Sequence, residues 1–152
     1  MTENKKARIL IIDDDSNILE VFETALKDAG YEVVQAKNGK EALELSNTNH
    51  YHLALIDIRL PDVEGTKMLE AFSKSNPKMK KIIITGFPSA SNAIEALNKQ
   101  ADAYLVKPVN IDDLLSEVAK QLKVREEDIK YSEQKVAEFV NSRIKEIQTL
   151  AA

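Results

Sequence analysis

The sequence contains no cysteine, so neither a disulfide framework nor thiolate chemistry is available to the protein. It also lacks any run of about 18 apolar residues, the length that predicts a transmembrane helix, and we expect no membrane partner. The first residues, MTENKKAR, lead into only four apolar residues, too few for the apolar region of a secretory signal peptide. These absences together predict a cytoplasmic protein.

A large excess of charge of one sign is lacking too. The formal net charge is −4 over 152 residues, which provides no overall attraction to nucleic acid, and we predict no direct nucleic-acid binding. The sequence shows no internal repeat and no low-complexity tract. Its length and its hydrophobic fraction of 43% are typical of one well-cored globular domain.

What the sequence does contain is a regular alternation of two patterns. Short runs rich in Ile, Val and Leu predict strands at residues 7–13, 31–36, 52–57, 81–85 and 102–106. Stretches of helical periodicity lie between them, and a fifth begins near residue 110. Ser16 and Asn38 are the predicted N-caps of the first and second helices, and Gly30 is placed to end the first.

Five strand-then-helix units predict an α/β fold, a doubly wound five-stranded parallel sheet of the (βα)5 kind, with an extended C-terminal helix. Four strands are nearly continuously apolar, as strands buried on both faces are, whereas residues 31–36 are more polar and suit an edge. The expected strand order is 2-1-3-4-5. In that order the first and third strands are neighbours, and ligands bind beyond the carboxyl ends where the order reverses.

Polar side chains follow four of the predicted strands at this carboxyl edge. Asp13 and Asp14 end the first, Asp57 the third, Thr85 the fourth and Lys107 the fifth. Clustered carboxylates suit a hard cation such as Mg²⁺, which usually takes one or two carboxylates plus a substrate phosphate. An aspartate can itself be a nucleophile that forms an acyl phosphate, and a lysine compensates the added charge. The set predicts phosphoryl transfer onto a carboxylate.

The motifs ILIIDDD, LALIDIRLPDVEG, IIITG and AYLVKP occur in one order along about residues 7–122. In this order they resemble the receiver domain of two-component response regulators. The resemblance implies a phosphorelay protein whose partner is a histidine kinase or a phosphotransfer protein. It also implies that the protein is not an enzyme in the ordinary sense, although it assists its own phosphorylation and dephosphorylation.

The resemblance implies a role for each aspartate of the predicted site. Asp57 would accept the phosphoryl group. Asp14 and Asp57 would bind Mg²⁺ directly, together with the backbone carbonyl of Arg59, and Asp13 would act mostly through a water. Asp15 is expected to be a loop charge or a partner of the first helix dipole rather than a ligand.

The resemblance also names the residues that would respond to the phosphoryl group. Lys107 would pair with a phosphoryl oxygen, and Thr85 would hydrogen-bond it. Tyr104 matches an aromatic switch position that rotates inward when Thr85 moves. The Lys107-Pro108 peptide bond would be cis, against the low base rate of that isomer.

Three positions depart from the family pattern. Gln100 stands where a glycine commonly precedes the last strand, so that turn is expected to close differently. Arg59 and Phe87 stand two residues after Asp57 and Thr85, and in the family these positions flank the route of the hydrolytic water. The lifetime of the phosphoryl group is therefore expected to be unusual.

Two other functions compete with the receiver interpretation. An aspartate-nucleophile phosphatase would need a second Asp two residues after the nucleophile, and Arg59 occupies that position. A receiver-like interaction scaffold without phosphotransfer would not need the full set of site residues.

The predicted receiver covers residues 1–122, and residues 123–152 are predicted to be an amphipathic helix. Apolar residues recur there at helical spacing, with Phe139 beside them: Ile129, Val136, Val140, Ile144, Ile147 and Leu150. Three arrangements are compatible with this stripe: folding back on the receiver, pairing with a second copy, or connecting to an output domain. We favour a homodimer, because exposed apolar stripes mark interfaces.

Overall fold

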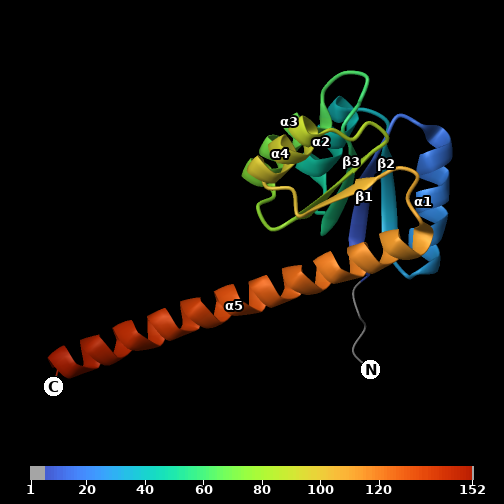
Figure 1. The fold of residues 1–152 in the computed structure, drawn as a ribbon. Helices are drawn as coiled ribbons and strands as arrows, with labels where there is room; N and C mark the ends of the chain where they lie inside the picture. The colour runs from blue at the N-terminus through green and yellow to red at the C-terminus, as the bar shows by residue number, and fades with distance from the viewer. Residues whose placement is uncertain (1–5, 152) are drawn as a thin grey trace.

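Five parallel strands form one sheet in the computed structural model, which describes residues 6–151 (Figure 1). The spatial order is β2-β1-β3-β4-β5, so the predicted order and fold class are confirmed. The strands are β1 (Arg8–Ile12), β2 (Glu32–Ala36), β3 (Leu53–Asp57), β4 (Lys80–Thr85) and β5 (Ala103–Val106). Each lies within a residue or so of its predicted bounds.

The burial of each strand follows its place in the sheet. All five residues of β3 are buried, as are the four apolar residues of β1 from Ile9 to Ile12. The edge strands β2 and β5 are only partly buried, and β2 is the strand with the most polar sequence. Strands that are covered on both faces need apolar residues throughout, which explains the continuous runs in the sequence.

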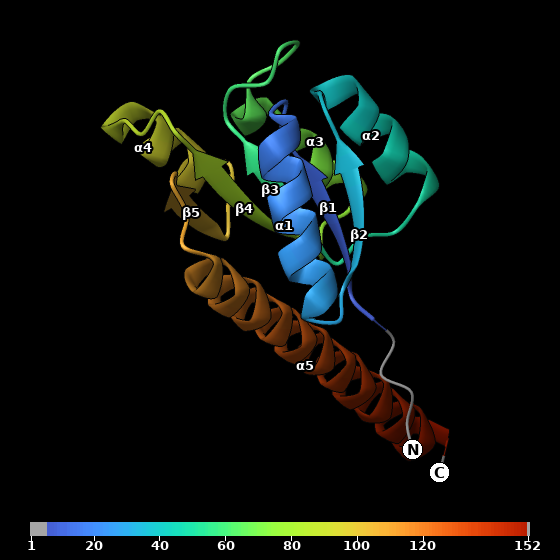
Figure 2. The same cartoon turned by 90° about the vertical axis from the view of Figure 1, so that its right-hand side faces the viewer.

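Helices cover both faces of the sheet (Figures 1 and 2). They are α1 (Ser16–Asp28), α2 (Gly39–Thr48), α3 (Gly65–Ser75), α4 (Ala90–Asn98) and α5 (Ile111–Ala151). One core cluster joins α1 and the first part of α5 to the sheet, around Phe22 and Leu114. The other joins α2, α3 and α4 to the opposite face, around Phe72 and Ala96.

The N-cap of the first helix lies one residue earlier than predicted. Asp15, not Ser16, is the N-cap of α1, and its carboxylate accepts hydrogen bonds from the backbone N–H groups of Asn17 and Ile18. The prediction for Ser16 was wrong because Ser16 already belongs to the helix. Asn38 caps α2 as predicted, through a bond from the N–H of Glu41.

Helices α1 and α4 end in the same hydrogen-bonded motif, but with different residues at its left-handed position. After α1 this residue is Gly30, with φ +98°. After α4 it is Gln100, with φ +69°. In both motifs the N–H of this residue and the N–H of the residue after it donate back to carbonyls of the last helical turn, so the turn at Gln100 closes in the ordinary way without its glycine.

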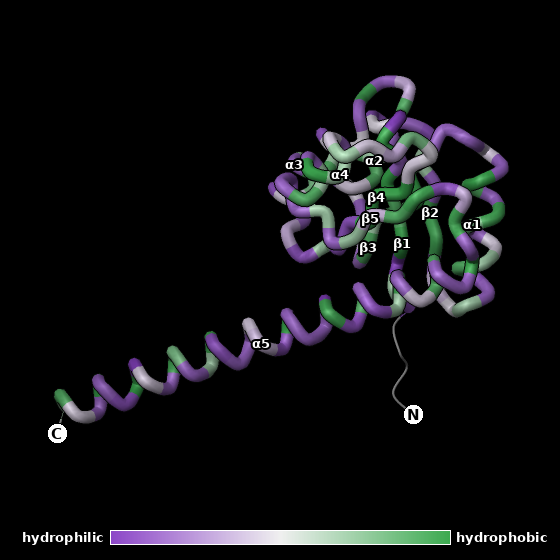
Figure 3. Tube along the Cα trace, viewed as in Figure 1, coloured by the Kyte–Doolittle hydropathy of each residue, from purple (hydrophilic) through white to green (hydrophobic). Residues whose placement is uncertain are grey.

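Helix α5 is one continuous element of 41 residues, so the predicted C-terminal segment continues the fifth helix without a break. At about 1.5 Å per residue its length is roughly 60 Å, and its outer half projects from the sheet (Figure 1). Burial ends at Ile129, and every residue from 130 to 151 is exposed. Apolar and polar residues alternate along this outer half (Figure 3). Within residues 6–151, no helix is both long and apolar enough to cross a membrane.

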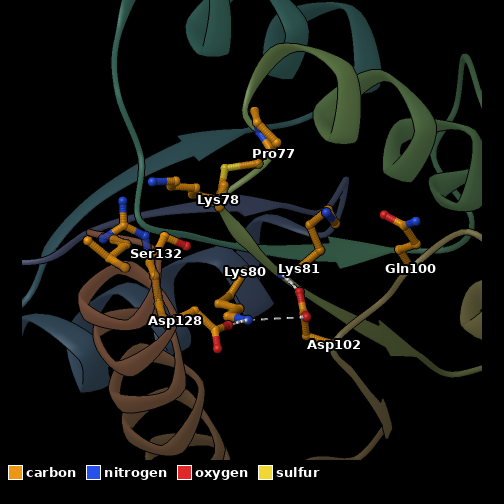
Figure 4. Close-up of a pocket in the computed structure, with 11 residues that line it drawn as sticks. Pro77, Lys78, Lys80, Lys81, Gln100, Asp102, Asp128 and Ser132 are labelled. Atoms are coloured by element: carbon orange, nitrogen blue, oxygen red, sulfur yellow. Dashed lines mark hydrogen bonds and ion pairs between the residues drawn. The ribbon is translucent and has the colours of Figure 1, made fainter. Parts of the chain in front are cut away.

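The last contacts between α5 and the sheet lie at the amino edge, beside a small hollow of about 210 Å³ (Figure 4). The Lys80 ammonium lies 3.1 Å from a carboxylate oxygen of Asp128 on α5 and 3.6 Å from one of Asp102. Lys81, next in β4, is buried and donates to the hydroxyl of Ser73. Burial lowers the pKa of the Lys81 ammonium, although the Asp102 charge opposes this effect.

The two helix ends generate a prediction for stability. A side chain in the left-handed region costs about 1–2 kcal/mol, whereas glycine there costs only chain entropy. We expect Gln100→Gly to raise the free energy of unfolding by about 0.5–1 kcal/mol and Gly30→Gln to lower it by a similar amount. Urea unfolding followed by circular dichroism measures both. A Gln100→Gly variant less stable than the wild type would contradict the assignment.

Candidate functional site

Three carboxylates meet at the carboxyl edge of the sheet. Asp13 and Asp14 follow β1, and Asp57 is the last residue of the neighbouring strand β3. One oxygen of each carboxylate lies within 4.8 Å of the others. Asp13 and Asp57 are buried, whereas Asp14 is exposed at the mouth of the site. The predicted cluster is therefore brought together by the predicted strand order.

Lys107, which follows β5, reaches across the edge to two of these carboxylates. Its ammonium lies 2.7 Å from Asp13 Oδ2 and 3.3 Å from Asp57 Oδ2. Its backbone N–H donates to the carbonyl of Thr85 at 2.7 Å, which fixes the start of the side chain beside β4. Burial acts to lower the pKa of Lys107, but the hydrogen bonds and charges of Asp13 and Asp57 outweigh it and raise the pKa.

Burial and a neighbouring carboxylate disfavour the ionised form of Asp57 more than one lysine can offset. Burial raises the pKa of its carboxyl, and the charge of Asp13 raises it further. Lys107 and a hydrogen bond from the N–H of Arg59 (3.3 Å) oppose this shift without cancelling it. The site therefore favours an additional positive charge near Asp57.

The donor atoms fit a small divalent cation. Asp13, Asp14 and Asp57 offer only carboxylate oxygens, the hard ligands that Mg²⁺ prefers, and the exposed Asp14 leaves a side open to water. Among the described residues this is the one cluster of acidic, histidine or cysteine side chains with a metal-ligating arrangement. Asp15 is outside it, because its carboxylate caps α1.

Thr85 ends β4 and is completely buried. Its hydroxyl oxygen accepts a hydrogen bond from the N–H of Phe87 at 3.0 Å. The hydroxyl hydrogen remains a donor, so the side chain can hydrogen-bond an anionic oxygen without losing this contact. Gly86 follows, and a Cβ atom at this position would make only ordinary van der Waals contact with the Lys107 side chain.

Arg59 and Phe87 contact each other although they come from different loops. The Arg59 guanidinium carbon lies 3.8 Å from the centre of the Phe87 ring, a cation–π contact. The Phe87 side chain is otherwise exposed. The sequence identified both positions but gave no signal that they stack, because the contact depends on how two irregular loops approach each other.

Tyr104 lies on β5 and packs against the core on the α2, α3 and α4 face. Its hydroxyl is buried and has no hydrogen-bond partner among residues 6–151. The ring in this structure is therefore turned toward the core. The Lys107-Pro108 peptide bond is cis, as the resemblance implied.

An apolar groove beside the site was not predicted. It lies between α1 and the segment after β5, has a volume of about 450 Å³ and includes Lys107 in its wall. Val21, in the same wall, is half exposed on α1. The periodicity of α1 predicted which of its faces is buried, but the groove depends on how the segment from Lys107 to Val109 runs past that helix.

Comparison with known proteins places the chain in a family. The profile of the response regulator receiver domain matches residues 9–119. The chain therefore belongs to this family of two-component signalling proteins, and the resemblance found in the sequence is confirmed. Receiver domains are regulators rather than enzymes of ordinary turnover, and they typically use Mg²⁺ at an acidic pocket such as this one.

Curated relatives share the receiver portion only. The alginate biosynthesis transcriptional regulatory protein AlgB of Pseudomonas aeruginosa is 36% identical over 125 residues, which cover 82% of this chain and 28% of that protein. The regulatory protein AtoC of Escherichia coli is 33% identical over 129 residues, with coverages of 84% and 28%. The chain thus spans less than a third of the length of these relatives.

Solved structures support the same conclusion. A CheY-like response regulator receiver domain protein from Methanospirillum hungatei JF-1 is 44% identical, with a TM-score of 0.80, over 82% of this chain and 99% of that one. The receiver domain of the Francisella response regulator 1452 is 36% identical, with a TM-score of 0.72, over 78% and 98%. Both likenesses confirm the fold class.

The raised pKa of Asp57 predicts a response to charge removal. Ionised Asp57 destabilises the fold increasingly as the pH rises from the ordinary carboxyl value through its raised folded-state value, and fully above that. We expect Asp57→Asn, without divalent cations at pH 7, to raise the thermal midpoint by about 2–4 °C, the effect of roughly 1 kcal/mol.

Thermal unfolding of the wild type and of Asp57→Asn, repeated with added Mg²⁺, provides the control. Mg²⁺ should raise the midpoint of the wild type and have little effect on Asp57→Asn, because a ligand that binds only the folded state stabilises it. A variant that is less stable than the wild type at pH 7 would contradict the assigned charge imbalance.

Proposed function

We propose that the chain is a phosphorylation-controlled switch in which Asp57 accepts a phosphoryl group from a histidine kinase or a phosphotransfer protein. The observation that carries the proposal is the bridge of Lys107 between Asp13 and Asp57, inside a group of three carboxylates. The family membership supports it, and a cytoplasmic location remains part of the proposal.

In the proposed reaction a carboxylate oxygen of Asp57 forms a bond to phosphorus. The bond between phosphorus and the histidine nitrogen of the donor breaks, and its electron pair stays on that nitrogen, which takes up a proton. Mg²⁺, held by Asp14, Asp57 and the carbonyl of Arg59, with Asp13 acting through a water, would neutralise charge on the transferring oxygens. Lys107 is already 3.3 Å from Asp57 and supplies a second positive charge at the acceptor.

The apolar groove between α1 and the segment after β5 is the proposed contact surface for the donor. Lys107 belongs both to the groove and to the site. A helix of the donor protein that packs against Val21 would therefore also lie close to Asp57. Contiguous exposed apolar surface marks sites of interaction with other proteins.

The proposed switch begins at Thr85. The phosphoryl group adds about −1.5 to −2 charge and strong acceptors, which would draw the Thr85 hydroxyl toward it. Tyr104 lies one strand away with its hydroxyl buried and unpaired among the described residues, so its position can respond to small changes beneath α4. The surface of α4, β5 and α5 would then change.

The stack of Arg59 on Phe87 is relevant to how long the phosphoryl group survives. The backbone N–H of Arg59 bonds the Asp57 carboxylate and that of Phe87 bonds the Thr85 hydroxyl, so the contact between the two side chains joins the loops that follow these site residues. We propose that it slows the access of the hydrolytic water. Arg59 also argues against the phosphatase alternative, because it cannot serve as the second acid.

The outer half of α5 is the proposed homodimer contact. Residues 130–151 are all exposed and carry an apolar stripe that includes Val140 and Ile144, each 46% exposed. The stripe residues follow one another at intervals of three, four or seven residues, which keeps them on one face of the helix. Two copies of α5 can therefore bury their stripes against each other. A connector to an output domain remains compatible with the same pairing.

Intact-mass measurement tests the acceptor. After incubation with acetyl phosphate and Mg²⁺ we expect one phosphoryl adduct on the wild type and none on Asp57→Asn. Asp14→Ala should abolish the divalent-dependent adduct. Asp15→Ala should keep it and lose only the α1 cap, about 1 kcal/mol of stability. An adduct that persists in Asp57→Asn would disprove the assignment, and a wild type that never forms one would favour the scaffold alternative.

Light scattering tests the dimer. We expect Ile144→Glu to weaken self-association by more than tenfold, because it places a charge in the buried stripe. Tyr131→Glu is the matched control: Tyr131 lies on the opposite face of α5, so its variant should associate like the wild type. Beryllofluoride, a phosphoryl mimic, should shift the association constant by roughly 5–150-fold. Equal effects of the two variants would place the contact elsewhere.

A further inference from the structure

The loop between β3 and α3, residues 58–64, is held at its base and at its tip. At the base, the N–H of Gly65 donates to the carbonyl of Ile58 at 2.7 Å, and Arg59 and Glu64 form an antiparallel bridge. This closure makes the loop a narrow projection directly after Asp57. Arg59 at its base and Asp62 at its tip therefore belong to one short closed segment.

At the tip, the carboxylate of Asp62 binds the start of a different helix. One oxygen accepts from the N–H of Gly39 at 2.8 Å, and the other accepts from the N–H of Lys40 at 2.9 Å. These are among the first N–H groups of α2, which have no partner within the helix. The two hydrogen bonds hold the pKa of Asp62 below its ordinary value.

Packing reinforces this contact. A Cβ atom on Gly39 would collide with the side chain of Val63, so the loop lies directly on the backbone at the start of α2. The segment before α2 in turn contacts the site, because the carbonyl of Ala36 accepts from the N–H of Asp13 at 3.1 Å. The loop tip is thus connected to the backbone of both strands that carry site carboxylates.

We propose that Asp62 is a positioning residue for the divalent-cation site. By clamping the loop tip to α2, it holds the Arg59 carbonyl and the Asp57 carboxylate in the arrangement that the cation requires. This inference rests on the proposed function, since it assumes that Mg²⁺ binds at Asp14, Asp57 and the Arg59 carbonyl. Residues that orient metal ligands without touching the metal typically change affinity by about 10–100-fold.

The test compares two substitutions at the same end of α2. Asp62→Ala removes the clamp between loop and helix. Asn38→Ala removes only the helix's own cap, a single bond to the N–H of Glu41 at 2.8 Å, and leaves the loop untouched. We expect Asp62→Ala to weaken Mg²⁺ binding, measured by calorimetry, roughly tenfold. Asn38→Ala should stay within about twofold, although it also destabilises α2.

Hydrogen exchange of the metal-free proteins gives a second readout that needs no ligand. Asp62→Ala should exchange faster across residues 58–64, and Asn38→Ala should not. Asp62→Asn, which keeps one acceptor oxygen, should lie between the wild type and Asp62→Ala in both measurements and serves if the alanine variant folds poorly. Equal loss of Mg²⁺ affinity in Asp62→Ala and Asn38→Ala would overturn the proposal. Failure of the wild type to bind Mg²⁺ at all would instead refute the proposed function.

Discussion

The structure depends on how one ammonium group is shared between two buried carboxylates. Lys107 contacts both Asp13 and Asp57, yet the pKa of Asp57 stays raised because burial and the second carboxylate outweigh a single lysine. Because Lys107 alone does not offset these effects, the unphosphorylated site favours the binding of a further cation. It also prepares the acceptor for chemistry, since charge added by a phosphoryl group meets a lysine that is already in place.

The rest of the fold keeps these two carboxylates and the lysine together by fixing the positions of the strand ends. Parallel pairing of β1 with β3 brings Asp13 and Asp57 to one edge, and pairing of β4 with β5 sets Thr85 beside the start of Lys107. Loop contacts then fix the backbone segments that follow the strand ends. The closure of Gly65 on Ile58 keeps the chain after Asp57 from spreading, at the point where a small change in backbone position alters the ligand set.

The sequence predicted the features that depend on periodicity and on chain order. The strands and their order follow from apolar runs and from the geometry of parallel sheets, and the structure confirms them. The same geometry places Asp13, Asp14 and Asp57 together, with Lys107 bonded to two of them. Features that depend on tertiary approach could not be read in this way. The stack of Arg59 on Phe87 joins two loops, and the clamp of Asp62 on α2 joins residues 23 apart. The cap of α1 was misassigned to Ser16 because Asp15 and Ser16 are both good caps, and only the backbone path decides between them.

The position of α5 constrains how a change at the site could reach the outer helix. The carboxylates lie at the carboxyl edge of the sheet, whereas the last contacts of α5 lie at the amino edge, where Lys80 is shared between Asp102 and Asp128 (Figure 4). Asp102 also accepts from the N–H of Lys81 and precedes β5, the strand that carries Tyr104. A shift of β5 driven from Thr85 would therefore alter the partner that competes with Asp128 for Lys80. The Asp128 side chain is 66% exposed, whereas the side chains of Lys80 and Asp102 are largely buried. Because an ion pair with an exposed partner contributes little on its own, a small shift of Asp102 can change how strongly Lys80 holds Asp128, and so the angle at which the outer helix leaves the receiver.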